Sequence, residues 1–360
     1  MQARDGDTIR IATFSAELSR PGPGLLLRDI LGREDGQIAA ALEVILAVDP
    51  DILLLTGFDF DLGNAALSAF AARLAESGAG YPHLFSRRPN AGLATGCDMD
   101  GNGRTGEPRD AQGYGAFAGQ GGMAVLSRLP ILGDQARDFS GLLWKDLPGA
   151  RLPQVAGTPF PSDEALAIQR LSSVGHWDLP VALPDGGMLH LLAFAAGPPV
   201  FDGPEDRNGK RNADEIRFWQ LYIAGSLDAE PPGRFVILGD ANLDPADGDG
   251  RHEAIAALLA DPRVQDPLPA GPGGAAVRDP GHRGDPAHDT VDWSGAESGG
   301  PGNLRVDYVL PSAGLRVVDA GVFWPSGSRL AGVAAAASRH RLVWVDIAAG
   351  RVGVVSAAPR

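Results

Sequence analysis

The sequence predicts an α/β protein in which sheets pack face to face and helices cover their outer sides. Three observations support this fold class. Short apolar runs of strand length recur along the chain, and helical segments tend to follow individual strands. The 360 residues also show no internal repeat and no clear linker. We therefore expect one domain over residues 1–360, with a core between about residues 9 and 347.

The first third of the chain predicts two strand–helix units. The weakly alternating segment Ile9–Phe14 and the fully apolar segment Ile52–Leu55 are the expected strands. Apolar residues recur at helical spacing in Gln37–Val48 and gather on one face of Asn64–Ser77, so both segments are expected to form helices. Pro50 follows the first of these helices and cannot continue it.

The rest of the chain predicts further strands, two helices and several long loops. The helices are expected at Ala213–Leu227, with Asp214, Glu215 and Arg217 exposed, and at His252–Leu259. Stretches rich in Gly, Asp or Pro predict loops over residues 91–121, 197–211 and 268–301. The remaining expected strands are Met123–Ser127, Ser172–Leu179, Met188–Phe194, Phe235–Leu238, Leu304–Leu310, Val317–Phe323 and Leu342–Ile347.

Composition and charge exclude several classes of protein. Lys and Arg total 31 against 45 Asp and Glu, which gives a net charge of -14. An acidic surface repels phosphate backbones, so bulk nucleic acid is disfavoured as a partner. The single Cys97 excludes an internal disulfide framework and a cysteine-based zinc site. No apolar run is long enough to span a membrane as a helix.

The N-terminus carries no recognisable targeting signal. Residues 1–7 contain no apolar segment of the kind that a secretory signal peptide needs. We expect the protein to be either cytoplasmic or the mature form of a secreted protein without its leader. The sequence does not decide between these two localisations.

The end of one apolar strand carries the first candidate site residues. Asp240 and Asn242 follow the expected strand Phe235–Leu238, after Gly239. Residues two apart in extended backbone point the same way, so the carboxylate and the amide would project together. Such a pair can hold a water, a metal ion or a phosphate oxygen, and it can equally be a plain turn or helix cap.

Other polar residues lie where strands begin or end. Ser15 and Asp59 follow the first two strands, and His340 precedes the last one. Asp307 lies inside an apolar strand, where a lone carboxylate needs a partner. A pair between Asp307 and His340 would satisfy both groups, because the carboxylate fixes the tautomer and favours the charged imidazole. A purely structural buried pair is the alternative.

Six motifs occur in an order and spacing typical of one protein family. They are Ile11–Ser19, Pro50–Leu55, Gly122–Ser127, Leu238–Pro245, Arg305–Val309 and Ser338–His340. On these motifs the chain resembles a bacterial member of the endonuclease/exonuclease/phosphatase superfamily, which includes deoxyribonucleases, inositol phosphatases and sphingomyelinases. The resemblance implies a four-layer α/β/β/α sandwich of two mostly antiparallel sheets, with a metal-dependent phosphoester site at one end.

The resemblance also implies catalytic roles for four residues that the chain retains. Asp240 and Asn242 would position and deprotonate an attacking water. His340 would grip the phosphate, and Asp307 would orient His340. Mg²⁺ or another divalent cation, held by carboxylate and amide oxygens, would polarise the phosphoryl oxygen. The implied substrate is a phosphate-containing small molecule or a phosphodiester.

The chain departs from the family pattern at four positions. Ser15 stands where the family has an Asn, and Gly57 stands where the family has a Glu. In the family, this Asn and this Glu both help to hold the metal. Ala195 stands where a His is expected, and Arg339 where the last Asp is expected. The resemblance therefore implies that the water-activating residues remain whereas the metal-holding residues are lost.

These departures predict a degenerate metal site and an activity that is lost or strongly impaired, because Mg²⁺ sites often rely on only one or two carboxylates. The alternative is an active divalent-metal-dependent phosphoesterase or nuclease with relocated ligands. In that case Asp59 would reach a metal that Asp240 also holds, or Arg339 would occupy the cation position, paired with Asp240, and hold a phosphate. A deliberate alteration of the site would produce the same sequence.

Two other segments allow more than one interpretation. Asp98, Asp100 and Asn102 have the spacing that begins a calcium loop, but Arg109 stands where an EF-hand needs a Glu. A weak Ca²⁺ site and a solvated acidic turn both fit this segment. The basic tract Arg207–Arg211 could rim a phosphate cleft or lie in a solvated loop.

Overall fold

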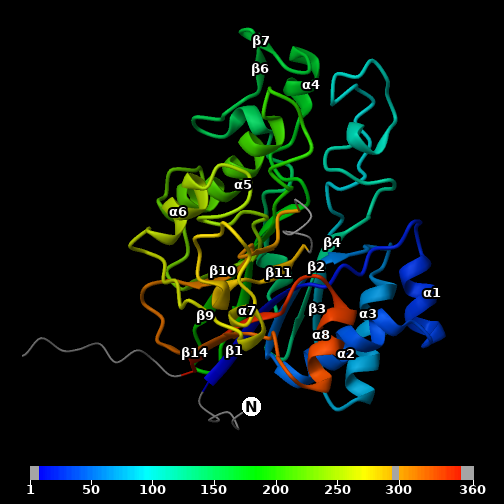
Figure 1. The fold of residues 1–360 in the computed structure, drawn as a ribbon, viewed down its shortest axis with the longest axis vertical. Coiled ribbons are helices and arrows are strands. Elements are labelled where there is room, and N and C mark those ends of the chain that lie inside the picture. The colour runs from blue at the N-terminus through cyan, green and yellow to red at the C-terminus, as the bar shows by residue number, and fades with distance from the viewer. Residues whose placement is uncertain (1–7, 294–299, 350–360) are drawn as a thin grey trace, which may run out of the picture.

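The protein is built on two sheets that pack face to face between layers of helices, as a computed structural model of residues 8–293 and 300–349 shows (Figure 1). Apolar side chains of both sheets meet in one buried cluster between them. Two further buried clusters join the helices to the outer faces of the sheets. The predicted α/β/β/α sandwich of two mostly antiparallel sheets is confirmed.

The first sheet has six strands, and β1 and β2 lie at its centre. In order across the sheet, the strands are β14 (Val317–Val322), β15 (Val343–Ala348), β1 (Thr8–Ser15), β2 (Ile52–Phe58), β4 (Gly122–Ser127) and β3 (His83–Ser86). β1 pairs antiparallel with β15 and parallel with β2, so Ser15 lies beside Thr56. The ends of these two central strands therefore lie together.

The second sheet has five strands, with β10 next to the edge. In order, they are β13 (Asp307–Pro311), β10 (Phe235–Asp240), β9 (Met188–Ala195), β8 (Gly175–Ala182) and β5 (Arg137–Asp138). β10 pairs parallel with β9 and antiparallel with β13. This register places Asp240 between Ala195 on one side and Asp307 on the other.

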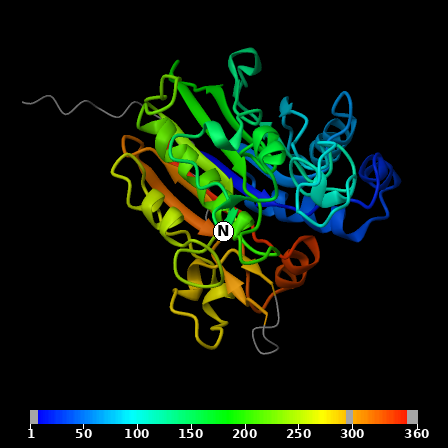
Figure 2. The same ribbon diagram turned by 90° about the horizontal axis from the view of Figure 1, so that it is seen from above.

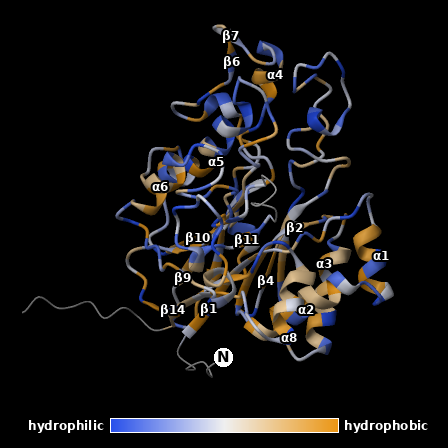
Figure 3. Ribbon diagram, viewed as in Figure 1, coloured by the Kyte–Doolittle hydropathy of each residue, from blue (hydrophilic) through white to orange (hydrophobic). Residues whose placement is uncertain are grey.

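Helices cover both outer faces of the paired sheets (Figures 1 and 2). On the first sheet lie α1 (Leu25–Gly32), α2 (Gly36–Val48), α3 (Ala65–Glu76) and α8 (Arg329–Ala337). On the second sheet lie α5 (Arg207–Ile223) and α6 (Glu253–Leu259). Figure 3 shows hydrophobic residues along the central strands and hydrophilic residues in many of the loops beyond the strand ends, as burial of the sheets requires.

Shorter elements lie in the connecting loops. They are η1 (Pro108–Asp110), η2 (Gly133–Gln135), η3 (Trp144–Asp146), η4 (Pro286–His288), α4 (Asp163–Ile168), α7 (Pro272–Ala275), the paired strands β6 (Gln154–Val155) and β7 (Thr158–Pro159), and the paired strands β11 (Val291–Asp292) and β12 (Asn303–Leu304). Among the described residues, no helix is long and apolar enough to cross a membrane.

The largest difference from the sequence-based expectation concerns α5. The helix begins at Arg207 and not at Ala213, so the basic tract is helical. Arg207 and Arg211 are buried, and the guanidinium of Arg211 donates to four backbone carbonyls, including that of Leu171 at 2.9 Å. The tract is therefore neither a solvated loop nor the rim of a cleft. Its hydrogen bonds offset the free-energy cost of burying its charges.

The expected exposure of Asp214 and Glu215 is also wrong. Asp214 accepts hydrogen bonds from the indole nitrogen of Trp144 at 2.8 Å and from an N–H of the preceding loop. Glu215 accepts the backbone N–H groups of Ser173 and Gly197. Both carboxylates are fully buried because they tie loops to the helix, a use of charge that periodicity does not reveal.

The sequence also left three helices and several boundaries unpredicted. α1, α4 and α8 lie in segments with no predicted element, and β8 begins at Gly175 and not at Ser172. The predicted loop over residues 268–301 contains α7, η4 and β11. Part of that prediction, residues 294–299, lies outside the described residues.

Gly239, the residue before Asp240, provides a test of this architecture. Its φ is 142°, and a Cβ added there would lie 1.8 Å from the carbonyl oxygen of Phe194 on β9. We expect Gly239→Ala to lower the free energy of unfolding by roughly 2–5 kcal/mol, because strain and overpacking add. Urea denaturation followed by circular dichroism measures this loss. Gly314→Ala is the control, since its Cβ would meet nothing within 4 Å. Equal stability of the two variants would contradict the packing described.

Candidate functional site

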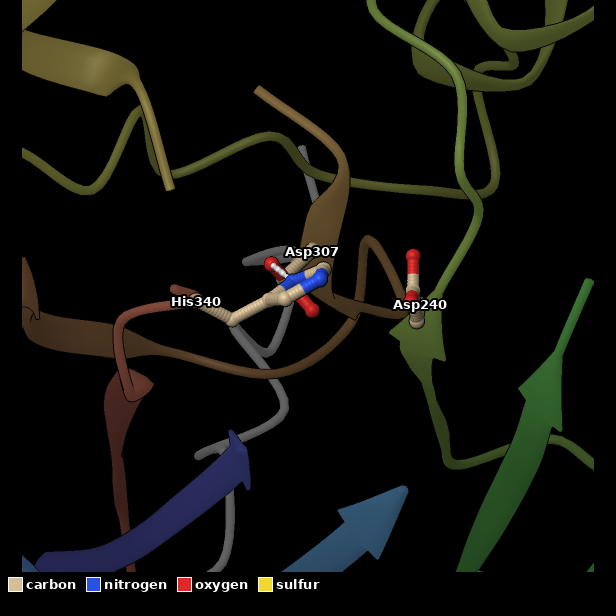
Figure 4. A group of neighbouring side chains, drawn as sticks. All are labelled: Asp240, Asp307 and His340. Carbon is tan, nitrogen blue, oxygen red and sulfur yellow. Dashed lines mark hydrogen bonds and ion pairs between the residues drawn. The ribbon is translucent and has the colours of Figure 1, made fainter. Parts of the chain in front are cut away.

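Strand ends from both sheets meet at one end of the sheets, and three ionisable side chains lie together there (Figure 4). β10 ends at Asp240, β13 begins at Asp307, and His340 precedes β15. The register of β10 and β13 sets the two carboxylates directly opposite each other. A carboxylate oxygen of each Asp and a ring nitrogen of His340 lie within 4.8 Å of one another.

Asp307 and His340 form the buried pair that the sequence predicted. Nδ1 of His340 lies 2.8 Å from Oδ2 of Asp307, and the hydroxyl of Thr290 donates to the same oxygen at 2.9 Å. The ring of Trp293 packs edge-on against His340, with 5.2 Å between ring centroids. The bond to Nδ1 leaves Nε2 as the ring nitrogen that a ligand can use.

The neighbours set the protonation of this cluster. Burial alone would lower the pKa of His340, but the charge and hydrogen bond of Asp307, with help from Asp240 and Glu17, raise that pKa to about 9. Burial, followed by the charge of Asp307, raises the pKa of Asp240 to about 7, although His340 opposes this shift. The arrangement therefore favours a protonated His340, and Asp240 and His340 titrate together and not independently.

Asn242 lies close to Asp240, but its side chain is bonded to the backbone. Its φ of 50° turns the chain at the end of β10, and its N–H donates to Oδ1 of Asp240 at 2.8 Å. Its side-chain amide donates to the carbonyl of Ala196 at 2.8 Å. The Asn242 amide therefore joins the ends of β10 and β9, and its nitrogen already has a hydrogen-bond partner.

The four altered positions gather around the same strand ends. Ser15 is the last residue of β1, and Ala195 is the last residue of β9 and lies beside Asp240. Gly57 lies in β2 with a φ of 67°, at a point where the register with β4 shifts. Arg339 precedes His340. The structure therefore brings the predicted positions to one end of the sheets, while the roles assigned to them stay predictions.

Glu17 is a site residue that the sequence analysis missed. Arg339 donates to Glu17 through its backbone N–H at 2.9 Å and through Nε at 2.8 Å, with a further contact from Nη2. The hydroxyl of Ser338 donates to the same carboxylate at 3.0 Å. The guanidinium also lies 4.6 Å from the centre of the Trp293 ring. Burial would raise the pKa of Glu17, but the hydrogen bonds from Arg339 lower it.

This ion pair corrects one expectation from the sequence. Arg339 pairs with Glu17 and not with Asp240. Sequence reasoning passed over Glu17 because it lies beyond the expected strand Ile9–Phe14 and the family resemblance assigns it no role. Its backbone has a φ of 50°, which turns the chain after β1. The sequence did contain a signal for this residue, because Glu17 is a carboxylate only two residues after Ser15, one of the four altered positions.

Asp59, the other proposed ligand, is held in a loop junction. Its two carboxylate oxygens accept the backbone N–H groups of Arg20 and Gly121, both at 2.8 Å. The side chain is buried, and burial raises its pKa despite these bonds. Asp59 does not belong to the cluster of Asp240, Asp307 and His340. These hydrogen bonds satisfy the buried carboxylate and are enough to explain its position.

A second acidic cluster could bind a metal ion at the predicted calcium segment. It consists of Asp98, Asp100 and Asp110, each with an oxygen within 4.8 Å of the others. Asn102 lies in the same turn, and its side-chain nitrogen donates to Asp100 at 3.3 Å and to Glu107 at 2.6 Å. Asp98 accepts several backbone N–H groups of its own turn, which an acidic turn without a metal also does. Asp110 lies beyond the segment on which the sequence prediction rested.

The chain belongs to the endonuclease/exonuclease/phosphatase family, because the model of that family matches residues 29–340. Two solved structures of bacterial members share the fold. An endonuclease/exonuclease/phosphatase from Beutenbergia cavernae aligns with a TM-score of 0.53 at 17% identity, covering 95% of this chain and 72% of that one. A family protein from Leptotrichia buccalis aligns with a TM-score of 0.50 at 14% identity, covering 94% of this chain and 99% of that one. No curated protein sequence matches the chain.

The protonation of His340 can be measured directly. We expect its pKa to fall from about 9 towards or below its ordinary value of 6.5 in Asp307→Asn, because burial then acts without the opposing charge. Because the folded-state pKa is raised, the pair stabilises the native state below about pH 6.5, and this contribution is lost as the pH rises through about 9.

An NMR titration of the imidazole nitrogens reports this pKa. Asp319→Asn is the matched control, since Asp319 is exposed on β14. A His340 that still titrates near its original pKa in Asp307→Asn would contradict the assignment of Asp307 as the cause.

Proposed function

We propose that this chain is a family member whose divalent-metal site is degenerate, so that metal-dependent phosphoester hydrolysis is lost or strongly impaired. One observation carries the proposal. Arg339, at the position where the family resemblance expects an Asp, holds its guanidinium against the carboxylate of Glu17. A positive side chain thus stands where a metal-binding carboxylate is expected, and it engages a neighbouring carboxylate as well.

The side chains around these strand ends fit a divalent cation poorly. Ser15 and Gly57 contribute no carboxylate, and the side-chain nitrogen of Asn242 is already bonded to a backbone carbonyl. Asp307 is hydrogen-bonded to His340, which leaves Asp240 as the other carboxylate of this cluster. Mg²⁺ sites rely on one or two ionised carboxylates, and the charge of Arg339 opposes a further cation.

The energetic consequence for hydrolysis is large. A bound divalent metal would supply charge stabilisation at the phosphoryl oxygen worth several kcal/mol. Loss of that stabilisation slows the chemical step by ~10²-fold or more. Asp240 and the protonated His340 remain near one another. The chain therefore keeps the groups for proton transfer and phosphate contact, whereas it lacks the metal ion that would act as the electrophile.

The retained groups support recognition of a phosphate group. The protonated His340, with Nε2 free of the bond to Asp307, is a donor suited to a phosphate oxygen. The ligand would be a phosphate-containing small molecule or a phosphodiester. The net charge of -14 argues against bulk nucleic acid, because long-range repulsion would oppose it.

A hydrolysis assay tests this proposal. The protein is incubated with bis-p-nitrophenyl phosphate in the presence of Mg²⁺, Mn²⁺ or Ca²⁺, beside its own Asp240→Ala variant prepared in the same way. We expect the two proteins to give the same background rate with each ion, and chelation with EDTA to change neither. Turnover that needs a divalent ion and disappears in Asp240→Ala would overturn the proposal.

A further inference from the structure

Three polar side chains on the strands that form the candidate site each bury an oxygen without a partner. The hydroxyl oxygens of Thr13 on β1 and Thr56 on β2, and Oδ1 of Asp307 on β13, make no hydrogen bond within the part of the chain that the structure describes. None of the three residues is more than 1% exposed. A buried polar atom without a hydrogen bond destabilises the native state, so three of them on neighbouring strands need an explanation.

The strand pattern directs both threonine side chains into the space between the two sheets. Ile11 and Leu54 belong to the buried cluster between the sheets, and Thr13 and Thr56 lie two residues further along the same strands. Side chains two apart in a strand point to the same face. Thr13 pairs with Leu54, which makes Thr56 its diagonal neighbour. Strand spacing and rise separate the two residues by about 8 Å, which is too far for a direct hydrogen bond and suits a bridging water.

Asp307 faces the same space from the second sheet. Val309, two residues after Asp307 on β13, belongs to the cluster between the sheets, so Asp307 also points towards the first sheet. Strand β1 packs against both β10 and β13. In Figure 4 the blue arrow of β1 ends below the labelled side chains of Asp307 and His340. The three unpartnered oxygens therefore lie on facing surfaces at one end of the paired sheets.

The hydrogen-bonding capacity of these groups favours water as the molecule that joins them. Oδ2 of Asp307 accepts from Thr290 and pairs with Nδ1 of His340, which leaves Oδ1 as an acceptor in need of a donor. A threonine hydroxyl has one proton to donate as well as lone pairs that accept. Water donates two hydrogen bonds and accepts two, so it can donate to Oδ1 and accept from a hydroxyl. A metal ion would accept neither hydroxyl proton.

We infer that the space between these strand ends binds one or more ordered water molecules, which join the hydroxyls of Thr13 and Thr56 to Oδ1 of Asp307. The water supplies the donor that Oδ1 lacks and gives the two sheets a polar connection beside the Asp307–His340 pair. Short side chains surround the site, since Ala195 ends β9 on the same face and Ser15 ends β1. A buried water needs polar partners and room, and this region offers both. The inference does not depend on the proposed function, because it requires neither a metal nor turnover.

A high-resolution crystal structure of the unaltered protein tests the water site. We expect a water at hydrogen-bond distance, about 2.6–3.2 Å, from Oδ1 of Asp307 and from at least one of the two threonine hydroxyls. Replacement of both threonines by Val keeps their branched shape and removes the hydroxyls, so Thr13→Val with Thr56→Val is expected to lose this water. Thr13→Ser with Thr56→Ser keeps the hydroxyls and is expected to keep the water.

Oxygen-17 magnetic relaxation dispersion checks the same site in solution, because it counts buried waters that exchange slowly. We expect the count to fall by at least one in the double Val variant and to stay unchanged in the double Ser variant. Thr158→Val is the matched control, since Thr158 is exposed on β7. If the double Val variant does not fold, the two single Val variants take its place.

The inference is overturned if Oδ1 of Asp307 in the crystal has no water or contacts a protein group instead. It is also overturned if the water makes no bond to either threonine, or if it persists in the folded double Val variant. A density peak at about 2.0–2.6 Å from Oδ1 would be a metal ion and would equally contradict it. Metal-dependent turnover by the unaltered chain would overturn the proposed function and leave the water site unaffected.

Discussion

The opposition of Asp240 and Asp307 across β10 and β13 is the constraint on which the rest of the site depends. Two carboxylates set directly opposite each other and buried between sheets destabilise the native state unless a cation offsets their charge. His340 supplies that cation from the segment before β15, and its hydrogen bond to Asp307 joins that segment to the second sheet. The high pKa of His340 and the raised pKa of Asp240 both follow from this arrangement.

The altered positions fit one another as well as this constraint. Gly57 gives the turn after β1 the space in which Glu17 lies, and Glu17 provides the carboxylate on which Arg339 rests. Trp293 packs against both His340 and Arg339 and so contacts both cations. Gly57, Glu17 and Arg339 therefore form one connected set of contacts at these strand ends.

Much of this architecture could be predicted from the sequence, because buried strands are apolar runs and their ends carry polar residues. The Asp307–His340 pair was predictable for the same reason, since a carboxylate inside an apolar strand requires a partner. The partnership of Glu17 and Arg339 was not predictable, because it joins residues more than three hundred positions apart through the turn after β1. The start of α5 was missed because polar residues that bind loop carbonyls, such as Arg211, look like loop residues in a sequence.

The central claim is that the unaltered chain holds an arginine–glutamate pair where related proteins are expected to hold a metal. A crystal of the unaltered protein soaked in Mn²⁺ tests this claim most directly, through the anomalous signal of manganese. The account predicts no anomalous peak beside the carboxylates of Asp240 and Asp307, with the Arg339 guanidinium resting on Glu17 and Trp293. A strong peak coordinated by those carboxylates, with Arg339 displaced into solvent, would contradict it.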